Sequence, residues 1–206
     1  MGAGRAVKAS VVGLRAVRVE VGSPAEALDL AAVIRRSALE VDEVVPGART
    51  VLLDGVEDPA ALIGMLPRLV TSLLSEAAAG RMVELPTTYD GEDLTRVADL
   101  WRCSVEEVVA RHTALTFTSA FCGFAPGFAY LTGLPPELQV PRLTEPRVRV
   151  PAGSVAMAGE WCGVYPVASP GGWLLLGHTD ATLWDPDSET PAVLAPGTRV
   201  RFSVHG

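Results

Sequence analysis

Lysine is almost absent from this 206-residue sequence, in which Lys8 is the single example. A P-loop needs a lysine after its glycines to reach the β and γ phosphates, so autonomous nucleotide binding of that type is excluded. Serine amidases of the Ser-Ser-Lys type need a buried lysine as base, and Lys8 precedes all recognisable elements. The G-x-S-x-G elbow is missing as well, because Val155 and Ala156 follow Gly153-Ser154. A hydrolase site complete within this chain is therefore not expected.

Cysteine and histidine are also scarce, with three residues of each. Cys103, Cys122 and Cys162 are widely spaced and contain no C-x-x-C pair, so they predict neither a disulfide framework nor a zinc site. The histidines lack the spacing of metal ligands. We therefore expect a reduced, cytoplasmic protein with no metal site and no biotinylation site.

Long apolar runs and an excess of basic charge are missing too. No stretch is long enough to span a bilayer, and Arg15, Arg18 and Glu20 interrupt the N-terminal apolar segment before it reaches the length of a signal peptide. The 17 basic and 24 acidic side chains give a net charge of −7, which offers no footprint for nucleic acid or an anionic membrane. Hydrophobic residues make up 49% and charged residues 20%, as in a soluble globular protein.

Residues 1–84 predict a small α+β domain, because helical and strand patterns alternate along them. A capping box over Ser23–Glu26 opens a first helix with one apolar face. A second helix opens at Asp58-Pro59 and ends at Gly80. The expected strands lie over residues 10–21, 44–53 and 82–85.

Residues 85–206 predict a second, mostly β domain. Two short helices come first, and a capping box over Ser104–Glu107 opens the second of them. A helix pair can read DNA, but this second helix is acidic, so DNA binding is not expected. Beyond His112 short strands alternate with Gly- and Pro-rich turns, which favours a closed or nearly closed antiparallel barrel, since closure removes exposed edges.

Four glycine- and proline-rich segments of the second half are candidates for a binding cleft. Glycines let backbone N–H groups approach a ligand, and prolines hold such loops in one shape. The same residues also occur where strands turn the corners of a small barrel. Aromatic side chains, and arginines that can fork onto a carboxylate or phosphate, favour the cleft. The segments are 123–130, 147–154, 159–166 and 169–173.

His112 and His178 are the candidate proton-transfer groups of the chain. His112 follows the second short helix and precedes the first barrel strand, so it is a candidate either for reaching the cleft or for capping its helix. His178 ends the apolar strand 173–176, where it either faces the cleft or lies in a surface loop. Cys122 and Cys162 have no basic neighbour and are interpreted as packing residues.

The order and spacing of the motifs in the second half match one known family over nearly the whole chain. The matching segments are Phe121–Tyr130, Pro141–Leu143, Pro146-Arg147, Val150–Val155, Gly163–Pro166, Ser169–Trp173 and Pro196–Phe202. They resemble the KipI family, whose members are also known as 5-oxoprolinase subunits of the B type, as allophanate hydrolase subunit 1, or as carboxyltransferase subdomain C and D.

The resemblance implies a cyclophilin-like barrel behind the α+β domain, in agreement with the pattern above. It also implies a larger cyclophilin-like partner subunit and, with a third protein, the ATP-dependent opening of 5-oxo-L-proline to L-glutamate. ATP would then bind through the complex rather than in this chain alone. Related domains of urea carboxylase handle carboxybiotin and urea. This chain has Trp161-Cys162 where the family commonly has Gln-Thr, and His178 where it commonly has Arg, which implies a different substrate choice.

Our first hypothesis is the smaller subunit of a multi-subunit hydrolase that acts on a C–N bond and is inactive alone. Arg147 or Arg149 would hold a carboxylate or phosphate of a small-molecule substrate. Backbone N–H groups near Gly153 and Gly171 would stabilise a developing oxyanion. The alternatives are a module that inhibits a histidine kinase and, by analogy of fold alone, a peptidyl-prolyl isomerase. The substrate-binding candidates are Phe124, Pro126, Gly127, Phe128, Arg147, Arg149, Gly153, Ser154, Tyr165, Gly171, Gly172, Trp173 and Thr179.

Overall fold

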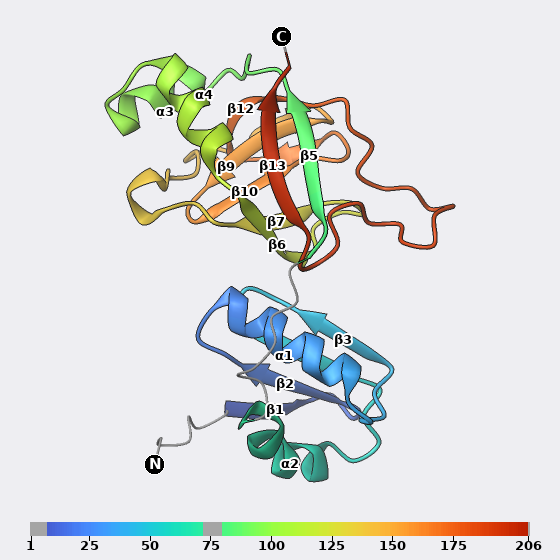
Figure 1. The fold of residues 1–206 in the computed structure, drawn as a ribbon. Helices are drawn as coiled ribbons and strands as arrows, with labels where there is room; N and C mark the ends of the chain where they lie inside the picture. The colour runs from blue at the N-terminus through green and yellow to red at the C-terminus, as the bar shows by residue number, and fades with distance from the viewer. Residues whose placement is uncertain (1–7, 72–79, 206) are drawn as a thin grey trace. The chain divides into compact units, whose positions relative to one another are not determined.

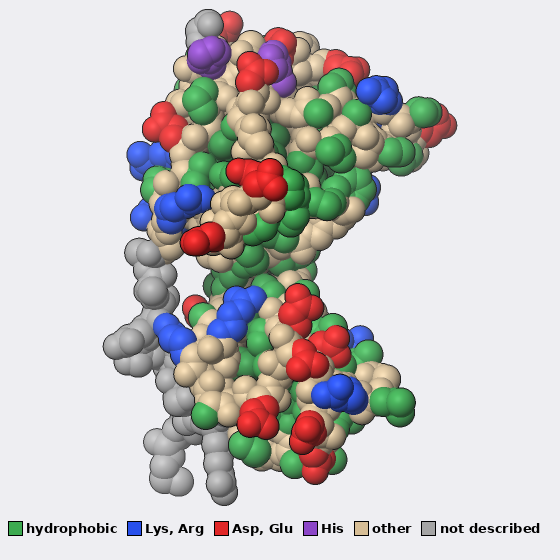
Figure 2. Space-filling view, turned by 90° about the vertical axis from the view of Figure 1, so that its right-hand side faces the viewer, with side chains coloured by type: hydrophobic (Ala, Val, Ile, Leu, Met, Phe, Trp, Pro, Cys, Tyr) green, Lys and Arg blue, Asp and Glu red, His purple; other side chains and the backbone are tan. Residues whose placement is uncertain are grey.

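The computed structural model describes residues 8–71 and 80–205, and the chain divides into two compact units (Figure 1). The first unit comprises residues 1–79 and the second residues 80–206. Among the described residues, no helix combines the length and the apolar character that crossing a membrane requires. Figure 2 shows one face of each unit, on which acidic and basic side chains are interspersed and form no continuous basic stripe.

A four-stranded antiparallel sheet with the order β1-β2-β4-β3 forms the centre of the first unit. Its strands are β1 (Lys8–Val12), β2 (Ala16–Glu20), β3 (Glu43–Pro46) and β4 (Thr50–Asp54). The single strand predicted over residues 10–21 is wrong, because the chain turns at Gly13, whose φ is +61°, and forms a hairpin. Lys8 is therefore part of β1, and its ammonium donates to the Glu20 carboxylate at 2.8 Å.

Two helices pack on this sheet. Helix α1 (Pro24–Arg36) contacts β3 and β4, and helix α2 (Pro59–Thr71) contacts β1 and β2. The predicted N-cap of α1 is confirmed, since the Ser23 hydroxyl accepts from the Glu26 N–H at 3.2 Å; the Glu26 carboxylate accepts from the Gly22 N–H at 2.8 Å. The predicted helix end at Gly80 cannot be followed, because residues 72–79 lie outside the described residues. The core consists of Val17, Val19, Ala27, Leu30, Ala31, Ile34, Val51, Leu53, Val56, Leu62 and Leu66.

A seven-stranded sheet curls into a nearly closed barrel in the second unit, in the order β12-β9-β10-β7-β6-β13-β5. One bridge joins its two outer strands, because the N–H of Thr88 donates to the carbonyl of His178 and the N–H of His178 donates back, both at 2.9 Å. The predicted mostly β barrel is confirmed. Its strands are β5 (Met82–Thr87), β6 (Phe117–Cys122), β7 (Ala129–Thr132), β9 (Ser154–Ala158), β10 (Trp161–Val164), β12 (Leu174–His178) and β13 (Arg199–Val204).

Strand β5 belongs to this barrel, whereas the sequence pattern assigned residues 82–85 to the first domain. It pairs in parallel with β13, with Leu85 opposite Phe202. A partner so distant along the chain leaves no local signal in the sequence. The division between the units therefore lies before Gly80 rather than after residue 84.

Helices α3 (Leu94–Trp101) and α4 (Val105–Ala114) pack on β12 and β13 respectively. The predicted capping box of α4 is confirmed, since the Ser104 hydroxyl accepts from the Glu107 N–H at 3.2 Å and the Glu107 carboxylate accepts from the Ser104 N–H at 3.0 Å. A short 3-10 helix, η1 (Pro136–Leu138), follows β7. Strands β8 (Arg147–Val150) and β11 (Ser169–Gly171) form a separate two-stranded sheet.

The barrel strands separate two apolar clusters because side chains alternate between the two faces of a strand. In β9, Met157 belongs to one cluster and Ala156 and Ala158 to the other; in β12, Leu174 and Leu175 divide in the same way. The first cluster is the main core of the unit and contains Phe117, Leu131 and Phe202. The second cluster lies beside the pocket described next and supplies part of its lining; it contains Phe128, Val150, Ala156, Ala158, Tyr165, Trp173 and Leu175.

Candidate functional site

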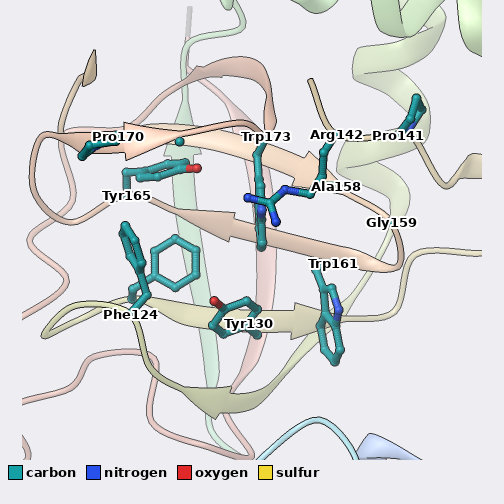
Figure 3. A pocket seen from close by; sticks show the side chains of 12 residues that line it. Phe124, Tyr130, Pro141, Arg142, Ala158, Gly159, Trp161, Tyr165, Pro170 and Trp173 are labelled. Carbon is teal, nitrogen blue, oxygen red and sulfur yellow. The ribbon is translucent and has the colours of Figure 1, made fainter. Parts of the chain in front are cut away.

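A cavity of about 470 Å³, partly open to solvent, lies against the second cluster (Figure 3). Six aromatic side chains form most of its wall, and glycine, alanine and proline complete it. Its size falls within the range of pockets that hold small organic ligands. The lining residues are Phe124, Phe128, Tyr130, Pro141, Arg142, Ala158, Gly159, Trp161, Tyr165, Pro170, Gly171 and Trp173.

Strand alternation aims several of these rings at the cavity. In β7, Tyr130 lines the pocket while its neighbours Ala129 and Leu131 belong to the main core. In β10, Trp161 lines the pocket and Cys162 turns to the main core. Two paired strands therefore each position a ring at the cavity without any irregular backbone.

Phe128 lies at the centre of the aromatic wall. Its ring contacts Phe124, Tyr130, Tyr165 and Trp173 with centroid distances of 5.1–5.5 Å and interplanar angles of 67–74°. Edge-to-face contacts of this kind stabilise each pair by about 0.5–1.5 kcal/mol beyond burial. The wall is thus a preformed surface rather than a set of independent side chains.

Phe124 has an unusual backbone at the rim of the pocket. Its φ is +69°, and the Ala125 N–H donates to the Gly123 carbonyl at 2.8 Å, which closes a three-residue turn with Phe124 in the middle. This is the rarer and more strained form of the γ-turn. The side chain is 60% exposed, although its edge meets Phe128 and Tyr165. A strained conformation that buries so little surface is typical of binding sites.

Arg142 is the single charged residue among those that line the pocket. Backbone hydrogen bonds anchor the chain on both sides of it, from Gly159 N–H to the Val140 carbonyl at 2.7 Å and from Leu143 N–H to the Gly172 carbonyl at 2.8 Å. Its side chain points into the cavity toward Trp173 (Figure 3). Within residues 8–71 and 80–205, no hydrogen bond or ion pair engages its guanidinium.

Tyr165 places its hydroxyl at the same cavity. Burial raises the pKa of this phenol, and the Arg142 guanidinium opposes the rise. The hydroxyl therefore stays protonated at neutral pH and offers a ligand a neutral polar contact. Gly171 faces it closely, because a Cβ at position 171 would overlap the Tyr165 hydroxyl.

Arg147, a predicted substrate-binding residue, has a different role in the structure. Its guanidinium donates to the Asp93 carboxylate at 2.7 Å and to the Trp173 carbonyl at 3.3 Å, and it lies 3.5 Å from Glu92. Asp93 also accepts from the Leu175 N–H at 2.7 Å. The Arg147 guanidinium therefore ties β8 to the start of α3 and is already engaged. Arg142, and neither Arg147 nor Arg149, is the arginine that lines the pocket.

His112, predicted as one of two catalytic candidates, is completely buried in the main core and does not line the pocket. Its Nδ1 lies 2.7 Å from the Tyr89 hydroxyl and its Nε2 lies 3.5 Å from Cys162 Sγ, while its ring packs against Phe117 and Phe202. Desolvation lowers the pKa of His112 to about 3 and raises the pKa of Cys162. Both groups are thus neutral, and the contacts indicate a structural role.

His178, the second catalytic candidate, also lies outside the pocket lining. Its backbone forms the bridge that closes the barrel, and its Nδ1 lies 2.9 Å from Asp90 Oδ1 at the exposed end of β12. The structure therefore favours the surface position for His178, which was one of the two alternatives open from the sequence.

Five of the thirteen predicted substrate-binding residues line the pocket together: Phe124, Phe128, Tyr165, Gly171 and Trp173. The other eight do not line it. Gly153 has a φ of +81° and exchanges backbone hydrogen bonds with Tyr165 and Thr179, so its N–H is already engaged. The Ser154 hydroxyl donates to the Pro151 carbonyl at 2.8 Å. The remaining members, which do not line the cavity, are Pro126, Gly127, Arg147, Arg149, Gly172 and Thr179.

The sequence reasoning did not name Tyr130 and Arg142 as site residues, and it treated Trp161 only as a departure from the family that affects substrate choice. Tyr130 and Trp161 stand two residues from Phe128 and Gly163 within segments already chosen, and the two-residue period of strands was the signal that could have found them. Arg142 carries no such signal, since nothing local distinguishes it from Arg147. No group of three or more His, Cys, Asp or Glu side chains that could hold a metal ion occurs in the part of the chain that the structure describes.

The fold and the pocket define a two-unit barrel protein with an aromatic cavity of ligand size. The chain belongs to the family described as "Carboxyltransferase domain, subdomain C and D", whose family model matches residues 7–194. This confirms the resemblance seen in the sequence.

Known relatives support the same placement. The chain is 42% identical over 168 residues to the B-type 5-oxoprolinase subunit of Escherichia coli O157:H7, a match that covers 79% of this chain and 77% of that protein. The crystal structure of TTHA0988 is similar at 39% identity with a TM-score of 0.77, and the match covers 93% of this chain but 40% of that chain. The K. lactis urea amidolyase, at 20% identity with a TM-score of 0.74 over 97% of this chain and 15% of that chain, shows the fold alone.

Proposed function

We propose that this chain is one subunit of an enzyme complex that opens the lactam of 5-oxo-L-proline with hydrolysis of ATP, and that its aromatic pocket binds the acid. The observation that carries the proposal is the pocket itself, with six aromatic rings around one guanidinium that has no partner among the described residues. The E. coli relative at 42% identity, which is named as a subunit of 5-oxoprolinase, supports the same substrate.

The pocket suits a small cyclic acid in shape and charge. A guanidinium binds a carboxylate through two parallel hydrogen bonds, which fixes the orientation of the ligand. Flat rings such as Trp173 and Tyr130 can cover the faces of a lactam. By excluding water, they would also strengthen the ion pair with Arg142. The Tyr165 hydroxyl would add a neutral hydrogen bond.

Bond breaking requires groups that this pocket does not provide. Neither His112 nor His178 lines it, and the lining residues contain no carboxylate, histidine or lysine. Lys8, the one lysine of the chain, pairs with Glu20 in the first unit. The proposal therefore assigns binding and orientation of the acid to this chain, and assigns the ATP-dependent step to a larger partner subunit in the complex.

The experiment is co-production of this chain with its partner subunits and measurement of 5-oxo-L-proline-dependent ADP release. We expect Arg142→Gln to lower kcat/KM at least about tenfold, mainly through KM, because the charged hydrogen bonds to the carboxylate are lost. Arg149→Gln removes the same charge from an exposed site outside the pocket and should stay close to wild type.

Two results would contradict the proposal. Partners that release ADP equally well without this chain would show that it is no subunit of the enzyme. Equal loss in the Arg142 and Arg149 variants would show that the effect is one of overall charge rather than of the pocket.

A further inference from the structure

We infer that the pocket selects acids whose nitrogen is uncharged, and that it releases the ring-opened product because it has no counter-charge for an ammonium group. This inference rests on the proposed function and concerns the ligand class of the same site. It follows from the charges around the cavity rather than from its shape.

Positive charge is the only charge that the lining presents. Among the twelve lining residues, Arg142 is cationic, and no aspartate or glutamate occurs. Glu160 is flanked by the lining residues Gly159 and Trp161, but it does not line the cavity itself. The Tyr165 phenol, whose pKa burial raises, stays neutral at neutral pH. A ligand therefore meets one cation, the neutral Tyr165 hydroxyl and ring surfaces.

A ligand ammonium would have no anionic partner among the residues that line the pocket. It would lie within a small cavity that already contains the Arg142 guanidinium, and like charges repel each other. Aromatic faces can attract a cation. Here, however, no carboxylate accompanies the rings in the lining, and the Arg142 guanidinium shares the cavity with them. The carboxylate of the same ligand would still be attracted to Arg142.

Opening of the lactam ring creates charged groups on the ligand for which the pocket has no partner. Hydrolysis of the lactam adds one water across the C–N bond. The carbonyl carbon gains the water oxygen and becomes a second carboxylate, while the nitrogen leaves the carbon, takes up the protons and becomes an ammonium. The net charge of the ligand stays the same, but two new charges appear, and the pocket provides a partner for neither. Affinity should therefore fall when the ring opens.

The test compares four ligands of known charge on the full chain. They are 5-oxo-L-proline, L-proline with the same ring and a charged nitrogen, 2-pyrrolidone with the same lactam and no carboxylate, and L-glutamate. The indole N–H signals of Trp161 and Trp173 in an NMR titration report binding in the pocket, since both rings line it. The signal of Trp101, which donates to the Leu138 carbonyl in the main core, serves as an internal control.

We expect 5-oxo-L-proline to bind at least about tenfold more tightly than each of the other three. Arg142→Gln should remove the advantage of 5-oxo-L-proline over 2-pyrrolidone, whereas Arg149→Gln should keep it. Arg142 is exposed and has no partner among the described residues, so its substitution should not disturb folding.

The inference is overturned if L-proline or L-glutamate binds as tightly as 5-oxo-L-proline, or if the wild-type chain shows no shift at Trp161 and Trp173 with any of them. Activity of the complex separates this failure from that of the proposed function. Normal 5-oxo-L-proline-dependent ADP release with no charge selection in the pocket would leave the function standing and place the acid elsewhere. Charge selection by the pocket without 5-oxo-L-proline-dependent ADP release would support the inference about the ligand class and contradict the proposed function.

Discussion

At the scale of single residues, Phe124 is the clearest case in which the local backbone serves binding rather than stability. Its left-handed φ of +69° costs on the order of 1 kcal/mol for a residue with a Cβ, whereas its side chain remains 60% exposed. Asparagine tolerates this backbone region better. We expect Phe124→Asn to change the free energy of unfolding by less than about 1 kcal/mol, and to weaken binding of 5-oxo-L-proline at least about threefold.

Chemical denaturation and the NMR titration measure these two effects on the same sample. Leu100→Asn is the matched control, because Leu100 is 46% exposed on α3 and does not line the pocket. Binding equal to wild type in the Phe124 variant, or a loss of stability above about 2 kcal/mol, would assign the ring to the fold instead.

The same scale shows where sequence reasoning about the site reached its limit. The rings of Phe124, Phe128 and Trp173 were predictable, because each directly follows a glycine within a segment already chosen as a candidate for the cleft. Arg142 and Arg147 could not be told apart. Asp93, far earlier in the chain, decides which of them is free, since its carboxylate occupies the Arg147 guanidinium.

At the scale of elements, the Asp93 carboxylate holds α3 to the barrel. Asp93 is 6% exposed and accepts from Arg147 and from the Leu175 N–H, both at 2.7 Å. Asp93→Asn would leave the largely buried Arg147 without its close anionic partner, so we expect a loss of about 3 kcal/mol of unfolding free energy. Glu92→Gln removes the same charge one residue away, from an exposed carboxylate 3.5 Å from Arg147, and should cost less than about 1 kcal/mol.

Urea denaturation of the two variants checks this difference. Equal stabilities would mean that the Arg147 ion pair contributes no more than an exposed one, and that packing alone holds α3.

Helices and strands were predictable from the sequence wherever neighbouring residues carry the pattern that defines them. This class contains the N-cap at Ser23, the capping box at Ser104 and the alternating strands of the second half. The hairpin at Gly13 was missed, because valines continue the apolar pattern on both sides of the turn. The placement of β5 was missed for a different reason: its partner β13 is the last strand of the chain, and parallel pairing leaves no trace in either segment alone.

At the scale of the whole molecule, the bridge between Thr88 and His178 closes the barrel, and the N–H groups of Gly91 and Asp93 extend the contact by donating to the carbonyls of Leu176 and Leu175. Strands β12 and β5 stand at the two ends of the strand order, and β12 begins directly after Trp173 of the pocket. Gly177 allows the closure, because a Cβ at this position would overlap the Thr88 carbonyl. Since the overlap is with backbone, no side-chain rotation can relieve it.

Gly177→Ala should therefore destabilise the second unit by at least about 2 kcal/mol, and lower the Tm of the barrel transition. The control is Gly64→Ala in α2, where a Cβ meets nothing within 4 Å; alanine favours a helix over glycine by about 1 kcal/mol, so this variant should be as stable as wild type or more so. Opposite signs for the same chemical change would separate closure of the barrel from any general effect of alanine. Differential scanning calorimetry measures both, and an unchanged Tm in Gly177→Ala would mean that the barrel holds together without its closing bridge.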